Sequence, residues 1–265
     1  MSEKSTRVIA IANEKGGVGK TSTVVNLAAA LTASGNSVLV VDMDPQHSAT
    51  RALGVDAPDS GLTTYHILTA NKPPDPAKAV TATRWEGLFL IPSHVDLAAA
   101  EVELVNKMAR EKRLKRLEPL LGLYDFILLD TPPSLSLLTV NVFAFAQEFL
   151  IPCQTQPHAY AAIDDLLDTV DLIREEINPA LSLTGVAATF YEPRTRVSRA
   201  VMEQIKTDER FTGKVFNTAV RTNATIAESS LHGTPVVFFR PGSSGAADYR
   251  ALAEELGRNG GAEAK

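Results

Sequence analysis

A glycine-rich loop stands close to the N-terminus, between a short apolar run and a longer segment of helical character. The apolar run covers residues 8–11, the loop at 15–21 reads KGGVGKT, and the helical pattern begins at Lys20. Glycines let a backbone turn tightly with its N–H groups pointing inward, so such a loop at a helix N-terminus binds phosphate. The order of strand, glycine loop and helix therefore predicts a phosphate-binding loop in an α/β protein.

Two side chains of the loop have separate expected roles. Lys20 is placed to reach the outer phosphates of a nucleotide, and the Thr21 hydroxyl to join the ligand shell of Mg²⁺. The loop therefore predicts a nucleotide and Mg²⁺ as cofactors. The residues expected to bind the nucleotide are Lys15, Gly16, Gly17, Val18, Gly19, Lys20, Thr21 and Ser22.

Two later apolar runs end in carboxylates. The run at 37–42 leads into Asp42 and Asp44, which point to the same side because residues two apart on a strand share a face. The run at 126–130 ends in Asp130, where an aspartate holds Mg²⁺ opposite the loop threonine. Ligands bind at the carboxyl ends of strands in open α/β sheets, so these carboxylates are candidates for the same site.

The first loop position, Lys15, is not needed to hold one nucleotide. Together with DMDPQ at 42–46 and ILLDTPPS at 127–134, the loop resembles the deviant Walker A loop of the ParA/MinD ATPases. In that family this lysine crosses a dimer interface to the nucleotide of the partner. The resemblance implies an ATP-dependent homodimer that hydrolyses ATP to ADP and phosphate.

The resemblance also implies roles for individual side chains. Asp44 is expected to orient the attacking water, and Asp42 to lie nearer the metal. The expected catalytic residues are Lys15, Lys20 and Asp44, and the expected metal-binding residues are Thr21, Asp42 and Asp130.

The resemblance covers roughly residues 7–256 and is most detailed for Soj-type ParA proteins. It implies partition of chromosome, plasmid or protein-cluster cargo, with nonspecific DNA and a ParB-like or other cargo adaptor as partners. Two positions depart from the family pattern. Glu14 stands where the family often has glutamine, and Thr225 stands where a family arginine is implicated in DNA contact.

Basic residues are concentrated in the C-terminal third. The formal net charge of −5 argues against a general nucleic-acid coat, but it leaves room for a local patch. The segment 191–225 is net positive, and its Arg194 falls where Soj-like proteins have a DNA-contacting arginine. The expected DNA-binding residues are Arg194, Arg196, Arg199, Lys206 and Arg221.

Two other functions are compatible with the loop. A MinD-like membrane switch needs a basic amphipathic C-terminal helix, whereas residues 252–258 are short and acidic. A small-molecule phosphotransferase or ligase, as among the dethiobiotin synthetase relatives, has no use for a lysine that acts on a second subunit. Both remain alternatives to the partition ATPase.

Composition and apolar runs predict the compartment. No apolar run approaches the ~20 residues that span a bilayer, and residues 1–7 carry no secretory signal, so no membrane association is expected. The single cysteine, Cys153, excludes a disulfide framework and follows an apolar run, which predicts a buried, inert thiol. We expect a cytoplasmic protein, and the DNA binding that the resemblance implies would associate it with the nucleoid.

Short apolar runs alternate with helical patterns along the whole chain, which predicts a doubly wound, mostly parallel sheet flanked by helices. One domain is expected over 1–265, with flexible tails at 1–6 and 258–265. The expected strands are 7–12, 37–42, 88–91, 125–130, 149–153, 184–189 and 235–239, with 215–216 a weaker candidate. The expected helices are 20–34, 95–118, 136–147, 163–177, 197–207 and 246–256.

Overall fold

The computed structural model describes residues 5–56 and 61–259, and most of the two expected tails lies outside these ranges. The strands are β1 (Arg7–Ile11), β2 (Val38–Asp42), β3 (Thr81–Ala82), β4 (Leu88–Ile91), β5 (Phe126–Asp130), β6 (Glu148–Gln154) and β7 (Ser182–Thr189). They form one sheet in the order β3-β4-β2-β5-β1-β6-β7. All neighbours are parallel except β3 and β4, which confirms the predicted fold class.

The helices follow the strands in alternation. The α-helices are α1 (Lys20–Ala33), α2 (Ser48–Ala52), α3 (Thr64–Thr69), α4 (Leu97–Leu104), α5 (Leu137–Phe145), α6 (Pro157–Ala161), α7 (Ile163–Glu176), α8 (Arg196–Thr207), α9 (Ala224–Leu231), α10 (Val236–Phe239) and α11 (Ser244–Asn259). Three 3₁₀ segments are Pro76–Ala79, Arg110–Leu120 and Glu209–Phe211. No described helix is long and apolar enough to cross a bilayer.

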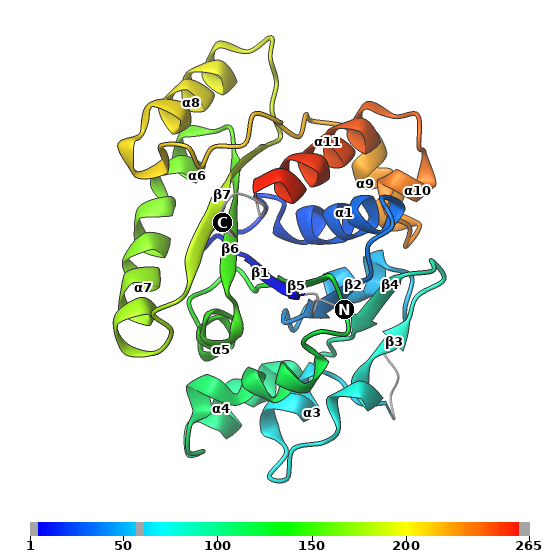
Figure 1. Ribbon diagram of the computed structural model, residues 1–265. Helices are drawn as coiled ribbons and strands as arrows, with labels where there is room; N and C mark the ends of the chain where they lie inside the picture. Colours follow the sequence, from blue (N-terminus) through cyan, green and yellow to red (C-terminus); the bar gives the residue numbers. More distant parts are fainter. Residues whose placement is uncertain (1–4, 57–60, 260–265) are drawn as a thin grey trace.

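Helices cover both faces of the sheet (Figure 1). Along β1, Val8 and Ala10 belong to the core beneath α5 and α7, while Ile9 and Ile11 belong to the core beneath α1 and α11. Alternate residues of a strand point to opposite faces, so a continuous apolar run is what a doubly covered strand requires. The two faces thus explain why the central strands read as unbroken apolar runs.

One expected strand is a helix. Residues 235–239 form the short helix α10, which begins after Pro235. The Val236 N–H donates to Asn26 Oδ1 of α1 at 2.7 Å, and Phe238 stacks on Trp85. A short run of β-branched and aromatic residues fits a buried helix as well as a strand, so its contacts with neighbouring elements determine which of the two forms.

The prediction of one long helix over 95–118 was also wrong in detail. It is divided into α4 and the 3₁₀ segment Arg110–Leu120, with Ala109 between them at φ 50°. The side chain of Asn141 on α5 accepts from Leu114 N and donates to the Arg110 carbonyl. These bonds satisfy backbone groups that a continuous α-helix would satisfy internally.

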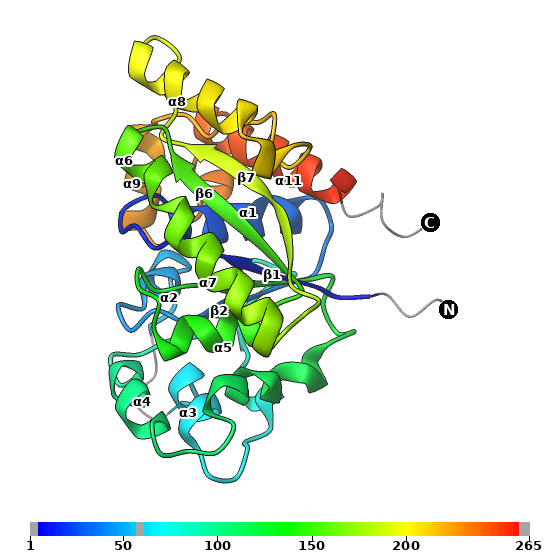
Figure 2. The ribbon, with the colours of Figure 1, turned by 90° about the vertical axis from the view of Figure 1, so that its left-hand side faces the viewer.

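Two smaller features also differ from the predicted strands. Val215 makes only an isolated bridge to Val186, so residues 215–216 form no strand. The short antiparallel β3 was not expected. Figure 2 shows α2, α6 and α9 at one end of the sheet, on the side where the parallel strands have their carboxyl ends. The predicted site residues lie at this end.

Candidate active site

The glycine loop connects β1 to α1 in a conformation that requires glycine. Gly17 and Gly19 have φ angles of 78° and 91°, which other residues adopt only with strain. Val18 between them is fully buried, and its carbonyl accepts a hydrogen bond from the Thr189 hydroxyl of β7 at 2.8 Å. The loop is therefore held open from the neighbouring part of the sheet, with its N–H groups available for phosphate.

Lys20 begins α1 and lies in the loop. Its ammonium donates to the Lys15 carbonyl at 3.0 Å, and the residue is only 7% exposed. Burial lowers the pKa of Lys20, while Asp130 and Asp44 raise it. A buried cation beside a phosphate loop is stabilised when a phosphate supplies the missing counter-charge.

Thr21 and Asp130 form a pair that fits Mg²⁺. The Thr21 hydroxyl donates to Asp130 Oδ2 at 2.8 Å, and Asp130 Oδ1 is buried without a hydrogen-bond partner among the described residues. Burial raises the pKa of Asp130 well above its usual range, and Asp42 raises it further, whereas the Thr21 hydroxyl lowers it. Mg²⁺ prefers oxygen ligands and takes few from the protein at nucleotide sites, so this hydroxyl and carboxylate fit the ion.

Asp42 has different surroundings, although it is the register partner of Asp130. Its Oδ2 accepts from the N–H and the hydroxyl of Thr50 at 2.8 and 2.7 Å, and its Oδ1 accepts from Asp44 N at 3.1 Å. Burial raises the pKa of Asp42 to about 6, against the effect of the Thr50 bonds. Both oxygens of Asp42 are thus engaged in holding the loop after β2.

Asp44 faces the same groove as the glycine loop. This groove has a volume of about 390 Å³ and is lined by Gly16, Gly17, Gly19, Lys20, Thr21, Ser22, Asp44, Ser48, Pro133, Phe190 and Ser230. The volume suits a small-molecule ligand. The structure therefore brings together Asp44 and the predicted loop residues, apart from Lys15 and the buried Val18, around one open groove.

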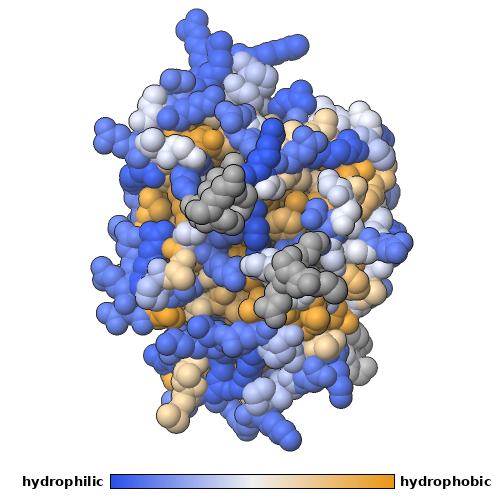
Figure 3. Space-filling view, in the orientation of Figure 1, coloured by the Kyte–Doolittle hydropathy of each residue, from blue (hydrophilic) through white to orange (hydrophobic). Residues whose placement is uncertain are grey.

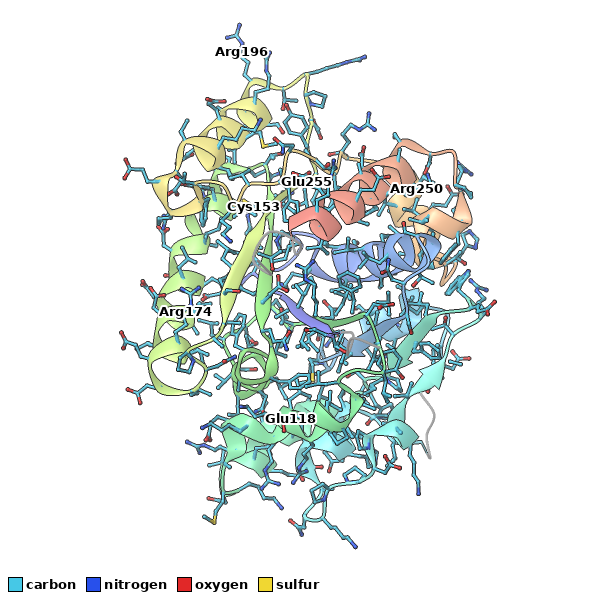
Figure 4. The ribbon with its side chains drawn as sticks, in the orientation of Figure 1. Glu118, Cys153, Arg174, Arg196, Arg250 and Glu255 are labelled. Carbon is cyan, nitrogen blue, oxygen red and sulfur yellow. The ribbon has the colours of Figure 1, made fainter. Side chains whose placement is uncertain are left out.

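Lys15 does not line the groove of its own chain. Within the described residues its ammonium has no hydrogen-bonding or ionic partner, although its N–H donates to Asn13 Oδ1 at 2.9 Å. Its charge acts on Cys153, but burial dominates and raises the pKa of that thiol to about 12, consistent with an inert cysteine. Figure 4 shows Cys153 within the sheet region, on β6.

A second cavity adjoins the groove and was missed by sequence reasoning. It has a volume of about 140 Å³ and shares Gly19, Ser22 and Phe190 with the groove. Its other lining residues come from the end of β7 and from the C-terminal segments, and they are Thr189, Val220, Arg221, Asn223, Ile226, Ala227 and Tyr249. Phe190 lines both spaces and has a φ of 48°, which is rare for a bulky residue and which no sequence motif signals.

The predicted DNA-binding residues fall into two groups. Arg194, Arg196, Arg199 and Lys206 are exposed on or next to α8, and none has an ion-pair partner in the part of the chain that the structure describes. Arg196 extends outward from the end of α8 in Figure 4, and Figure 3 shows this end of the molecule as hydrophilic. Arg221 lies apart from them, where its guanidinium pairs with Asp248 at 2.6 Å.

Comparison with known proteins agrees with this geometry. Residues 6–183 match the family model described as an AAA domain, which covers more than half of the chain. The chain is 41% identical over 255 residues to the sporulation initiation inhibitor protein Soj of Bacillus subtilis, covering 96% of this chain and 99% of that protein. It is 39% identical to the chromosome partitioning protein ParA of Myxococcus xanthus, covering 94% and 87% of the two chains.

A solved structure shares the fold and binds a nucleotide. The cobyrinic acid a,c-diamide synthase of Mycobacterium smegmatis, with bound ADP and magnesium, has a TM-score of 0.83 and 34% identity. The match covers 97% of this chain and 96% of that one.

Proposed function

Because the chain belongs to the ParA/Soj family of ATPases, we propose that it is an ATP-driven switch that partitions a cargo by cycling on and off DNA. It is an ATPase, and its cofactors are ATP and Mg²⁺. The glycine loop would hold the triphosphate, and the adjoining cavity lined by Phe190 would hold the base. The observation that carries the switch is the Lys15 ammonium, unpaired among the described residues, beside a groove that already contains Lys20.

The switch is a dimer that closes on ATP. Lys15 reaches the nucleotide of a second copy, so the outer phosphate is bound by both subunits. When that phosphate leaves, the interaction that favours the closed state disappears and the dimer opens. A ligand shifts the equilibrium between two states only by the difference in its affinity for them. The loss of the outer phosphate therefore determines when the dimer opens.

Hydrolysis depends on positioning and on charge. Lys20 compensates the charge of the outer phosphates, Thr21 and Asp130 hold Mg²⁺, and the Asp44 carboxylate orients the attacking water. Bound Mg²⁺ neutralises charge that develops on the phosphate oxygens. Phosphoryl transfer requires little covalent chemistry from the protein, so these four side chains act by positioning and by neutralising charge.

DNA binding belongs to the basic surface of α8, defined by Arg194, Arg196, Arg199 and Lys206. One such surface offers few phosphate contacts, whereas a closed dimer presents two to one duplex and gains from their linkage. A cargo-linked adaptor of the ParB kind stimulates hydrolysis and so releases the dimer from DNA. Association with the nucleoid follows from this cycle.

One pair of variants tests the assignment of the site. Lys20→Ala removes the buried counter-charge of the phosphates and is expected to abolish tight ATP binding. Asp44→Ala is expected to bind ATP with near-normal affinity but to hydrolyse it at least ~100-fold more slowly, because only water orientation is lost. Fluorescent-ATP titration and phosphate release measure the two effects. An Asp44→Ala protein that hydrolyses ATP at the parental rate contradicts the assigned role.

A small-molecule synthase is the second candidate, because the Mycobacterium smegmatis structure carries such a name. The two functions differ in what stimulates ATP turnover. Turnover that rises only when a small metabolite is added supports the synthase, while turnover that rises with DNA and an adaptor protein supports the partition switch.

A further inference from the structure

The backbone of Asp44 is held on both sides by buried groups. Its N–H donates to Asp42 Oδ1 at 3.1 Å, and its carbonyl accepts from the Ser93 hydroxyl at 2.8 Å. The same carbonyl also accepts from His47 N at 2.8 Å. Asp44 lines the groove, and its Oδ1 accepts from Gln46 N at 2.9 Å, so the position of its carboxylate depends on the loop backbone that these contacts hold.

Thr50 joins the two sides of this arrangement. It donates its N–H and its hydroxyl to Asp42 Oδ2, at 2.8 and 2.7 Å. Its hydroxyl oxygen in turn accepts from Ser93 N at 3.1 Å. Asp42, Thr50 and Ser93 are all 0% exposed, so water cannot replace a lost bond without a shift of the chain.

Three segments meet in this network, and the one after β4 is distant in the sequence from the other two. Asp44 follows β2, Thr50 lies on α2, and Ser93 follows β4. Both hydroxyls donate to acceptors within Asp42–Asp44, and neither contacts the groove. Their polar atoms are therefore directed at the loop that carries Asp44, not at the nucleotide.

We propose that Thr50 and Ser93 are positioning residues for hydrolysis, which hold the backbone of Asp44 so that its carboxylate lies where the attacking water binds. The inference rests on the proposed function, because it requires Asp44 to orient that water. It adds residues that make no contact with ATP and that belong to none of the three sequence motifs.

The expected signature is a loss of rate without a loss of substrate binding. Displacing a catalytic group by about 1 Å costs on the order of 100-fold in rate. Because His47 N still holds the Asp44 carbonyl, the loop shifts and does not unfold. We expect kcat to fall roughly 10-fold or more, with the KM for ATP changed by no more than about 2-fold.

The experiment compares four variants of the full chain. Ser93→Ala removes one donor to the Asp44 carbonyl, and Thr50→Val removes the hydroxyl at nearly constant shape. Thr50→Ser restores the hydroxyl. Thr69→Val is the matched control, because the buried Thr69 hydroxyl donates to the Tyr65 carbonyl on α3, away from the groove. Steady-state hydrolysis gives kcat and KM, and thermal unfolding checks that each variant is folded.

Three results support the inference together: low kcat with unchanged KM in Ser93→Ala and Thr50→Val, recovery in Thr50→Ser, and parental kinetics in Thr69→Val. Parental kcat in Ser93→Ala overturns it, and so does a parallel rise in KM. If Thr50→Val does not fold, Ser93→Ala still decides. Asp44→Ala distinguishes failure of the proposed function from failure of this inference. An active Asp44→Ala protein contradicts the proposed role of Asp44. An inactive Asp44→Ala protein together with an active Ser93→Ala protein contradicts only the positioning role of Thr50 and Ser93.

Discussion

Asp42 and Asp130 are neighbours on paired strands, but among the described residues only Asp130 has a carboxylate oxygen without a hydrogen-bond partner. Both oxygens of Asp42 accept hydrogen bonds from Thr50 and Asp44, while Asp130 Oδ1 is buried without a partner among the described residues. The sequence placed Asp130 near the metal because it ends a buried strand, and Asp42 because of the family resemblance. The sequence could not distinguish the surroundings of the two carboxylates, because no sequence motif indicates the hydrogen bonds from Thr50 to Asp42.

This difference predicts separate effects of two similar substitutions. Asp130→Asn is expected to raise the Mg²⁺ concentration for half-maximal hydrolysis about 10-fold or more, because a carboxylate facing the ion is lost. Asp42→Asn is expected to leave that concentration nearly unchanged. It instead lowers the free energy of unfolding by about 1–3 kcal/mol, because buried donors lose a charged acceptor. Magnesium titration of the ATPase and urea unfolding measure the two quantities, and equal magnesium shifts in both variants contradict the distinction.

At the scale of elements, the central strands and the helices α1, α5 and α7 were predictable, whereas the short helices α2, α3 and α10 were not. A strand covered on both faces must be a continuous apolar run, so β1, β2 and β5 were evident from their residues. The run at 235–239 is equally apolar, but it packs as α10 against α1, where Asn26 caps its first N–H. Contacts of this kind depend on residues some 200 positions away and leave no local pattern.

The β1, β6 and β7 strands are joined at their start by one carboxylate. Glu148 accepts two hydrogen bonds from the Arg7 guanidinium, at 2.8 and 2.7 Å, and one from the Thr184 hydroxyl at 2.8 Å. Burial alone raises the pKa of Glu148, but the bonds from Arg7 and Thr184 outweigh it, and the net pKa lies below its ordinary value of 4.5. A carboxylate with a depressed pKa stabilises the fold only while it is ionised.

Glu148→Gln is therefore expected to lower the free energy of unfolding by about 1–3 kcal/mol at pH 7. The contribution of Glu148 is complete above pH 4.5 and is lost as the pH falls through its lower folded-state value. The difference between the two proteins should shrink over that range in urea unfolding. Glu175→Gln, at an exposed position of α7, is the matched control, and a deficit that persists unchanged in acid contradicts the ionic origin.

The basic surface of α8 makes a prediction about DNA. Arg194→Glu and Arg199→Glu are expected to lower the affinity of the ATP-bound protein for any DNA sequence, while ATP hydrolysis without DNA stays normal. Affinity decreases with salt, and the plot of log affinity against log salt should become less steep by about 0.9 for every DNA phosphate that is no longer neutralised. Lys78→Glu is the matched control, because this exposed lysine precedes β3 at the opposite edge of the sheet from β7. Equal weakening by Lys78→Glu would show a general charge effect, and so would contradict a specific role of α8.

At the scale of the whole molecule, the carboxyl ends of the strands bring the glycine loop and Asp44 to one open groove, with Asp130 buried beneath it against Thr21. The three sequence motifs were enough to predict this gathering, because parallel strands present their carboxyl ends at the same edge. The cavity lined by Phe190 was not predictable, since its walls come from the end of β7 and from segments beyond residue 220. Among the described residues, the Lys15 ammonium lies outside the groove without a hydrogen-bonding or ionic partner, and we propose that it binds the nucleotide of a second copy of the chain.

Light scattering of the Asp44→Ala protein with ATP and Mg²⁺ tests this central claim most directly, because ATP then stays intact. We predict a dimer that forms only with ATP, and a return to monomer when Lys15→Gln is added, although the monomer still binds ATP. Gly16→Val should also block closure: among the described residues of its own chain a Cβ at Gly16 meets only Pro133, at 3.8 Å, so the monomer should accept the new side chain. Undiminished ATP-dependent dimers in the Lys15→Gln protein would contradict the claim that Lys15 acts across a subunit interface.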